Sequence, residues 1–218
     1  MNRPIVALSM RTDLNRHGLR ESRIEHSWFT FVSELFSQEP IVILIPNTIT
    51  EFTFLSYFKP DLIVLSGGND IAQSGETENS YRTRDLIERE LILSNPNVPV
   101  LGVCRGFQLI NTLLGGLVRQ ASNHAGTTHE VEITNNFNFS DYPSKFMTNS
   151  FHNWVINESD LAENLEAIVK SHDGLIESAR HKEKPWFMTM WHPERANTGD
   201  IQREWVLDYL RSFVLIGE

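Results

Sequence analysis

Short runs of apolar, mostly β-branched residues recur along the chain, and stretches with helical spacing of apolar positions separate them. Such runs are typical of strands that are buried on both faces of a mainly parallel sheet. They occupy residues 5–8, 41–45, 62–65 and 98–103. The first half of the chain therefore predicts four buried strands.

Amphipathic segments lie between these runs. Apolar residues recur every three or four positions over 24–36, after Ser22, and over 86–93, before Asn95 and Pro96. A third helix is predicted over 107–114, where Gly115 and Gly116 end it. Strands that alternate with helices predict an α/β fold with right-handed crossovers and helices on both faces of the sheet.

The second half of the chain is less regular. The segment 117–151 is rich in Asn, Thr and His and contains alternating stretches, which we interpret as strands and loops at one edge of the sheet. Further strands are predicted at 166–170, 174–179 and 186–191, and a closing amphipathic helix at 200–213. No internal repeat or linker divides the sequence, so residues 1–218 are expected to form a single domain.

Composition narrows the class of protein. The chain has 218 residues, 40% of them hydrophobic and 22% charged, which is typical of a globular protein with a full core. A net charge of −9 argues against general nucleic-acid binding. No signal peptide or membrane-spanning stretch is evident, and a single cysteine excludes an internal disulfide. We expect a cytoplasmic protein without nucleic-acid or membrane partners.

That single cysteine, Cys104, lies between a predicted strand and a predicted helix, with Gly102 and Gly106 on either side. Small flanking residues allow a tight turn that exposes a nucleophile, as in Gly-x-Ser-x-Gly. The free N–H groups and positive dipole at the helix start favour a thiolate. A lone cysteine is more often a small buried hydrophobe, but its glycine neighbours favour a nucleophile.

A cysteine nucleophile needs a base, and the base needs a carboxylate that orients it. His192 and Glu194 directly follow a predicted strand and are separated by Pro193, so both are expected at the carboxyl edge of the sheet. The same His-x-Glu could instead belong to a metal site, but no further ligands at zinc spacing are evident. We therefore predict a Cys104–His192–Glu194 triad and no metal or cofactor.

Donors for an oxyanion are expected from two places. The sequence Ser-Gly-Gly-Asn-Asp at 66–70 follows the third strand, and it lacks the Lys-Ser/Thr of a phosphate loop. The backbone amides of Gly68 and Arg105 are then placed to stabilise a developing negative charge. A double glycine alone is more often a plain turn, so this assignment depends on the other parts of the site.

Three segments, 66–70, 102–108 and 191–194, together resemble class I glutamine amidotransferases, and in particular their freestanding γ-glutamyl hydrolase branch, the Peptidase C26-like group. Further matches at 84–88, 115–116, 129–131, 149–153 and 173–177 extend the resemblance over nearly the whole chain. It implies a three-layer, flavodoxin-like fold and hydrolysis of a γ-glutamyl amide through a γ-glutamyl thioester.

The resemblance also implies substrate-binding residues. Gln108, one helical turn after Cys104, corresponds to a residue that helps to hold the glutamate moiety. The loop 149–154, with Asn149, Ser150 and His152, corresponds to the one that closes over the α-amino and α-carboxylate groups of that moiety, and Gly67 is a further candidate. A structural role for His152 and for His129 stays open. The remaining histidines of the second half and of the first helix are expected to be structural or exposed: His26, His124, His172 and His181.

The segment 11–23 is expected to be a loop, and it carries four arginines in an acidic protein. It leaves the first strand at the same sheet edge as the triad. Because a guanidinium binds phosphate or carboxylate with two parallel hydrogen bonds, Arg16 and Arg20 are candidates for binding an anionic, nucleotide-linked leaving group. Alternatively, the loop is solvated and pairs with Glu21 and Glu25.

Three classes of function remain open from the sequence. The leading hypothesis is a hydrolase of a small-molecule γ-glutamyl substrate, with an anionic leaving group like that of a subgroup tied to surface-polysaccharide synthesis. The second is a glutaminase subunit that supplies ammonia to a separate synthetase. A hydrolase of γ-glutamyl-polyamine or GABA type is a further alternative within the hydrolase class. A non-catalytic binding module is disfavoured because nucleophile, base, carboxylate and glycine loop occur together.

Overall fold

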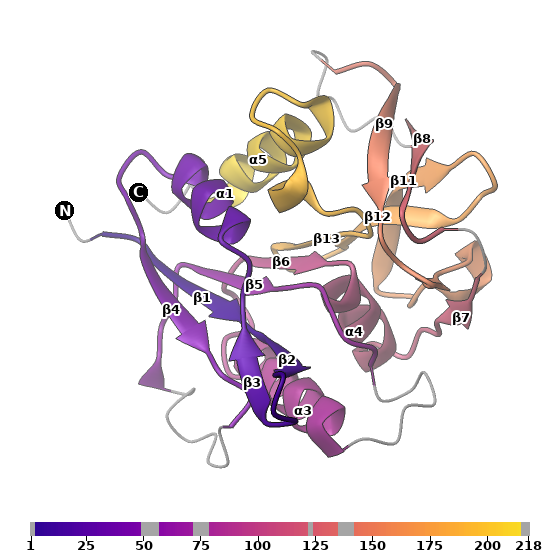
Figure 1. The fold of residues 1–218 in the computed structure, drawn as a ribbon. Helices are drawn as coiled ribbons and strands as arrows, with labels where there is room; N and C mark the ends of the chain where they lie inside the picture. The colour runs from indigo at the N-terminus through magenta and orange to yellow at the C-terminus, as the bar shows by residue number, and fades with distance from the viewer. Residues whose placement is uncertain (1–2, 49–56, 72–78, 122–123, 135–141, 215–218) are drawn as a thin grey trace.

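The computed structural model describes residues 3–48, 57–71, 79–121, 124–134 and 142–214. Within this part of the chain, one large sheet of nine strands runs through the molecule (Figure 1). Its strand order is β4 (Ile41–Ile45), β1 (Ile5–Ser9), β5 (Leu62–Leu65), β6 (Val100–Val103), β13 (Trp186–Thr189), β12 (Ile176–His181), β11 (Leu165–Ser171), β8 (Thr127–Ile133) and β9 (Lys145–Ser150).

The sheet has a parallel half and an antiparallel half. Strands β4, β1, β5, β6 and β13 pair in parallel, and in chain order they give the 2-1-3-4-5 arrangement of flavodoxin-like folds. Strands β12, β11, β8 and β9 continue the sheet in antiparallel fashion. The predicted α/β, flavodoxin-like fold is confirmed.

Helices cover both faces of the parallel half and complete the three layers (Figure 1). Along β1, Val6 and Leu8 pack with Trp205, whereas Ala7 belongs to the opposite core with Phe107. Burying each large apolar side chain stabilises the fold by about 1.5–3 kcal/mol. The two helix pairs are α1 (Ser27–Leu35) with α5 (Ile201–Val214), and α3 (Asn79–Leu93) with α4 (Arg105–Leu113).

The packing of α4 against β5 depends on a glycine. A Cβ on Gly106 would lie 2.3 Å from the carbonyl oxygen of Leu65, far inside van der Waals contact. The missing side chain lets the first turn of the helix approach the sheet, so that the helix begins directly after Cys104. This contact fixes the start of α4 at the carboxyl edge of the sheet.

Most predicted elements are present. The runs 41–45 and 62–65 coincide with β4 and β5. Strand β5 is buried as predicted, but β4 is an edge strand with Ile41, Ile43 and Leu44 exposed, so the prediction that it is buried on both faces is wrong. The edge assignment of the segment 117–151 is confirmed by β8 and β9, although residues 122–123 and 135–141 lie outside the described residues. Small elements complete this half: β7 (Arg119–Gln120), β10 (Trp154–Val155), and the 3₁₀ turns η2 (Glu158–Asp160) and η3 (Pro193–Arg195).

The arginine-rich segment differs from its prediction. In place of a loop it forms a hairpin of β2 (Arg11–Leu14) and β3 (Arg20–Arg23), and α1 begins only at Ser27. The side chain of Asn69 holds this hairpin to the glycine loop, since it accepts from the N–H of Thr12 at 2.8 Å and donates to its carbonyl at 2.7 Å. A charged hairpin lacks the apolar alternation that marks a strand in a sequence.

Among the described helices, none combines the length and apolarity needed to cross a membrane.

Candidate active site

Cys104 lies at a strained turn between β6 and α4. Its backbone has φ 52° and ψ −101°, a conformation that costs a non-glycine residue energy and is typical of a nucleophile elbow. Its N–H donates to the carbonyl of Thr189 on the neighbouring strand β13 at 2.7 Å. The elbow is therefore tied to the strand that leads to His192.

His192 and Glu194 follow β13 and are both buried. Nδ1 of His192 lies 2.6 Å from Oε1 of Glu194, so that this ring nitrogen donates to the carboxylate. The ring also forms a hydrogen bond with Cys104, for which Nε2 is the remaining ring nitrogen. The three side chains thus form one hydrogen-bonded chain, with the histidine between a thiol and a carboxylate.

The charge around His192 favours its protonated form. Burial alone would lower its pKa, but the negative charge of Glu194 and the hydrogen bonds to Cys104 and Glu194 outweigh burial. Together they raise the pKa of His192 to about 10. At neutral pH the imidazole therefore carries a proton that it can give to a leaving group.

The glycine loop after β5 packs directly against this histidine. A Cβ on Gly67 would lie 2.4 Å from Cε1 of His192, so only glycine leaves room for the ring. The buried guanidinium of Arg84 donates to the carbonyl oxygens of Ser66 at 2.6 Å, Gly67 at 3.2 Å and Gly68 at 2.7 Å. Because a trans peptide points its N–H opposite its C=O, the amide of Gly68 faces away from Arg84.

Arg84 belongs to a buried ionic network. Its Nε donates to Glu88 at 2.9 Å, and Glu88 and Asp85 both pair with the guanidinium of Arg105. Burial alone would raise the pKa of Glu88, but the charges of Arg105 and Arg84 hold it below its usual value. Burial and the charge of Arg105 lower the pKa of Arg84 to about 10. The side chain of Arg105 is thereby held beneath the site.

A cavity of about 250 Å³ opens beside Cys104. The structure brings six of the predicted site residues to this cavity: Cys104, His192, Gly68, Arg105, Gln108 and His152. The lining is completed by Asn69 and Asp70 of the glycine loop, by Phe151, Asn153 and Trp154 of the segment that follows β9, both indicated by the sequence, and by Arg195. The cavity is of a size that suits a small ligand.

Gln108 and His152, both on the wall of this cavity, share one hydrogen-bond partner. Nε2 of Gln108 donates to the carbonyl oxygen of Trp154 at 3.3 Å, and Nδ1 of His152 lies 3.1 Å from the same atom. Burial lowers the pKa of His152 below its ordinary value. Both side chains are therefore held in place by the segment that follows β9.

Asn149 and Ser150 lie behind the cavity instead of lining it. The side chain of Asn149, expected to contact substrate, binds the main chain of His192: its Oδ1 accepts from N–H at 2.8 Å, and its Nδ2 donates to the carbonyl at 2.9 Å. Ser150 is fully buried in β9. Asn149 thus fixes the main chain of His192.

Arg16 and Arg20 lie on the exposed hairpin and are not among the residues that line the cavity. Nε of Arg16 donates to Nε2 of the neighbouring His17 at 3.0 Å. The cavity has a different arginine, Arg195, which directly follows Glu194 in the chain. Its guanidinium pairs with both oxygens of Glu25, at 2.7 and 2.9 Å, and lies 4.8 Å above the ring of Phe151.

The fold is that of class I glutamine amidotransferases. A solved structure from Thermoplasma acidophilum, of a candidate GMP synthase subunit, superposes with a TM-score of 0.73 at 19% identity and covers 100% of this chain and 96% of its own. The chain belongs to the Peptidase C26 family, whose model matches residues 4–194. This confirms the resemblance found in the sequence, and with it the expected class of amide-bond hydrolases.

Two of the relatives have names that state different activities. The gamma-glutamyl-CDP-amidate hydrolase of Campylobacter jejuni is 33% identical over 179 aligned positions, and the match covers 79% of this chain and 84% of the relative. The glutamine-hydrolyzing subunit of the GMP synthase of Pyrococcus abyssi is 31% identical over 177 residues, covering 80% of this chain and 85% of the relative. This chain is similar to both a hydrolase and a synthase subunit.

Proposed function

We propose that this protein hydrolyses γ-glutamyl amides with Cys104 as nucleophile, His192 as general acid and base, and Glu194 as the carboxylate that orients the histidine. One observation carries the proposal. At the strained elbow, Cys104 and Glu194 bind the two sides of the His192 ring, and Nδ1 of the ring lies 2.6 Å from the carboxylate. This is the geometry that a nucleophile, its base and an orienting group require.

In the first half of the reaction, the sulfur of Cys104 attacks the γ-carbonyl carbon. The carbonyl oxygen takes up negative charge, which the amides of Gly68 and Arg105 stabilise. The C–N bond then breaks, and the proton held by His192 moves to the leaving nitrogen. The products of this half are the released amine or amidate and a γ-glutamyl thioester on Cys104.

In the second half, water replaces the leaving group. His192 takes a proton from the water, whose oxygen attacks the thioester carbon. The C–S bond breaks, glutamate leaves, and the thiolate of Cys104 returns beside protonated His192. Gln108 and His152 hold the glutamyl part in this scheme, since both lie on the cavity wall and are fixed through Trp154.

For the leaving group we propose a nucleoside diphosphoramidate, so that the substrate is γ-glutamyl-CDP-amidate and the products are CDP-amidate and glutamate. The support is the Campylobacter jejuni relative and Arg195, a cation on the cavity wall. Phosphate oxygens suit a guanidinium. The reaction would serve capsular polysaccharide synthesis in the cytoplasm, where a lone thiol stays reduced. Arg16 and Arg20 stay candidates for a more distant part of the nucleotide.

Two alternatives have their own support. A glutaminase subunit that supplies ammonia to a synthetase agrees with the Pyrococcus abyssi relative. A γ-glutamyl-polyamine or GABA-type hydrolase draws on Asp70, an acid that lines the same cavity as Arg195. The three functions share the triad and differ in the leaving group.

A glutamate-release assay separates them. The purified protein is given γ-glutamyl-CDP-amidate, γ-glutamyl-putrescine, γ-glutamyl-GABA and glutamine at equal concentrations. We expect the amidate to be cleaved with the highest kcat/KM, and Cys104→Ala to abolish turnover of every substrate while the unfolding temperature stays close to that of the wild type. Full activity of Cys104→Ala would refute the triad, and preference for glutamine would favour the glutaminase.

A further inference from the structure

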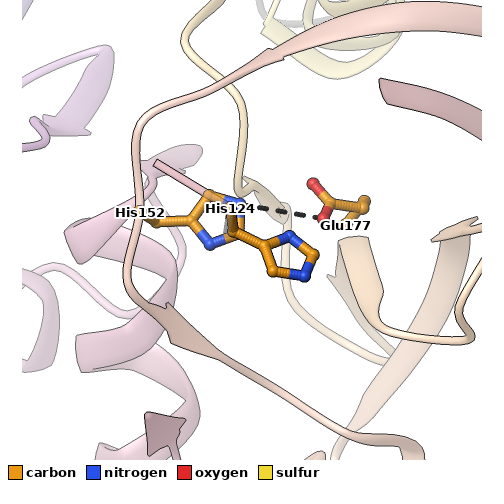
Figure 2. Close-up of side chains that lie close together, drawn as sticks. All are labelled: His124, His152 and Glu177. Carbon is orange, nitrogen blue, oxygen red and sulfur yellow. Dashed lines mark ion pairs between the residues drawn. The ribbon is translucent and has the colours of Figure 1, made fainter. Parts of the chain in front are cut away.

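Three histidines and a glutamate meet beside the active-site cavity, and the triad does not use them. His124 precedes β8, His129 lies on β8, His152 follows β9 and Glu177 lies on β12. One ligand atom each of His124, His152 and Glu177 lies within 4.8 Å of the others (Figure 2). His152 is 3% exposed and Glu177 is 1% exposed, so these two side chains are buried.

The hydrogen bond of His152 fixes which ring nitrogen carries its hydrogen. The carbonyl oxygen of Trp154, 3.1 Å from Nδ1, can only accept, so Nδ1 is the donor. Nε2 then presents a lone pair, and it faces Oε1 of Glu177 at 3.8 Å. That distance is too long for a hydrogen bond. The lone pairs of Nε2 of His152 and Oε1 of Glu177 therefore face each other in the protein interior without a proton between them.

His124 repeats this arrangement. Its Nε2 lies 3.3 Å from Oδ2 of Asp173, which therefore binds that side of the ring. Its Nδ1 is buried and has no hydrogen-bond partner in the part of the chain that the structure describes. The ring stacks on His152 with centroids 5.6 Å apart. Histidines that bind metals typically donate one ring N–H to a carboxylate or carbonyl and offer the other nitrogen to the ion.

Glu177 supplies the negative charge of the cluster. Nε2 of His129 lies 3.3 Å from its Oε1, close enough to form an ion pair when His129 is protonated. Oε1 and Oε2 are both buried, and neither has a hydrogen-bond partner among the described residues. An uncompensated carboxylate oxygen in such a place is costly unless a cation or donor meets it.

We propose that His124, His152 and Glu177 bind a Zn²⁺ ion, with His129 as the residue that positions Glu177. Two imidazoles and a carboxylate are a ligand set that zinc accepts, with a fourth position left for water. Tetrahedral bonds of about 2.05 Å place ligand atoms about 3.4 Å apart, so small side-chain rotations close the site. Magnesium and calcium prefer oxygen ligands and do not match this set.

The proposed zinc site can be reached from the protein surface, and an ion bound there affects the active-site cavity. A surface cavity of about 790 Å³ is lined by His124, His129 and Asp173, and gives the ion access. His152 also lines the cavity that holds Cys104. An ion at this place therefore fixes one wall of the active-site cavity without taking part in the triad.

Zinc binding to the full chain tests the proposal. Cys104→Ser serves as the background, because a free thiol beside His192 could bind zinc by itself. After treatment with a chelator and dialysis, the protein is titrated with ZnCl₂ by calorimetry, and with MgCl₂ in a parallel run. We expect one zinc ion per chain, micromolar or tighter affinity, and no magnesium binding.

Variants locate the ion. His124→Ala and Glu177→Gln, made in the same background, should lose this binding, and His129→Gln should weaken it by about 10- to 100-fold. His17→Ala, which removes a histidine from the hairpin, is the matched control and should bind as the background does. Circular dichroism shows whether each variant is folded. Absence of zinc binding in the folded background, or equal binding by folded His124→Ala, would overturn the proposal.

Discussion

Asn149 holds the main chain of His192 by two hydrogen bonds, one in each direction, at 2.8 and 2.9 Å. The two residues come from different halves of the sheet, since Asn149 belongs to the edge strand β9 and His192 follows β13. The antiparallel half of the sheet therefore positions His192, the base of the proposed triad.

This relationship predicts a selective loss of kcat in Asn149→Ala. Without the amide, the main chain of His192 loses one donor and one acceptor, and the ring is no longer held toward Cys104. We expect kcat to fall about 10- to 100-fold, in line with the cost of a small misplacement of a catalytic group, while KM changes little. Steady-state kinetics measure both constants; a rise in KM at unchanged kcat would instead indicate the substrate contact expected from the sequence.

Gly67 predicts a steric effect on the same histidine. A methyl group in Gly67→Ala would meet the His192 ring, because a Cβ would lie 2.4 Å from its Cε1. We expect kcat/KM to fall by more than 100-fold. Gly174→Ala is the control: its φ of +85° makes alanine strained by about 1 kcal/mol, but nothing lies near its Cβ. That control should lose some thermal stability and keep its activity.

The electrostatics of His192 predict the alkaline limit of the reaction. Because its pKa is raised to about 10, the imidazolium persists well above neutral pH. The value of kcat/KM should therefore decline only as pH approaches 10, instead of near 6.5. Glu194→Gln removes the negative charge that raises the pKa, so its alkaline limb should move to lower pH. Profiles that coincide for the two proteins would contradict this role of Glu194.

The buried network beneath the glycine loop predicts how stability depends on acid. The pKa of Glu88 in the folded protein is held below its usual 4.5. The contribution of Glu88 to the free energy of unfolding is therefore fully present above pH 4.5, and it is lost as the pH falls through this lowered pKa. Glu88→Gln leaves Arg84 and Arg105 without this carboxylate and should lower the free energy of unfolding at pH 7 by about 3–5 kcal/mol.

Urea unfolding between pH 3 and 7 measures this effect. The curve of Glu88→Gln should be flatter than that of the wild type over the acid range. Glu158→Gln is the matched control, since the Glu158 side chain is 75% exposed in its pair with Lys170. Surface pairs of this kind contribute about 0–1 kcal/mol. A loss of stability that is equal in the two variants would contradict the network.

The sequence predicts the parallel half of the fold well, because buried strands such as 62–65 are continuous apolar runs between glycine and proline signals. It also indicates Cys104, His192 and Glu194, since each lies at the end of such a run. The hairpin of Arg11–Leu14 and Arg20–Arg23 was wrongly predicted as a loop. Charges occupy both of its faces, so no apolar face marks it as a pair of strands.

Two further features depend on contacts between residues that are far apart in the sequence, and no local sequence pattern indicates such contacts. Arg195 reaches the cavity wall because Glu25, 170 positions earlier, holds its guanidinium. The cluster of His124, His152 and Glu177 comes from three separate segments, and their spacing matches no metal-binding motif. Nothing in the order of these residues along the chain indicates that they meet.

The hydrogen bond from the N–H of Cys104 to Thr189 also bears on how the protein is made. Strand β13 is inserted between β6 and β12, so the thiol and its base become neighbours only after the ribosome has synthesised residues far beyond the nucleophile. Until then the nascent chain carries an ordinary cysteine with no partner to take its proton. In the proposed mechanism, the thiol is therefore activated only after β13, the last strand of the parallel half, has docked beside β6.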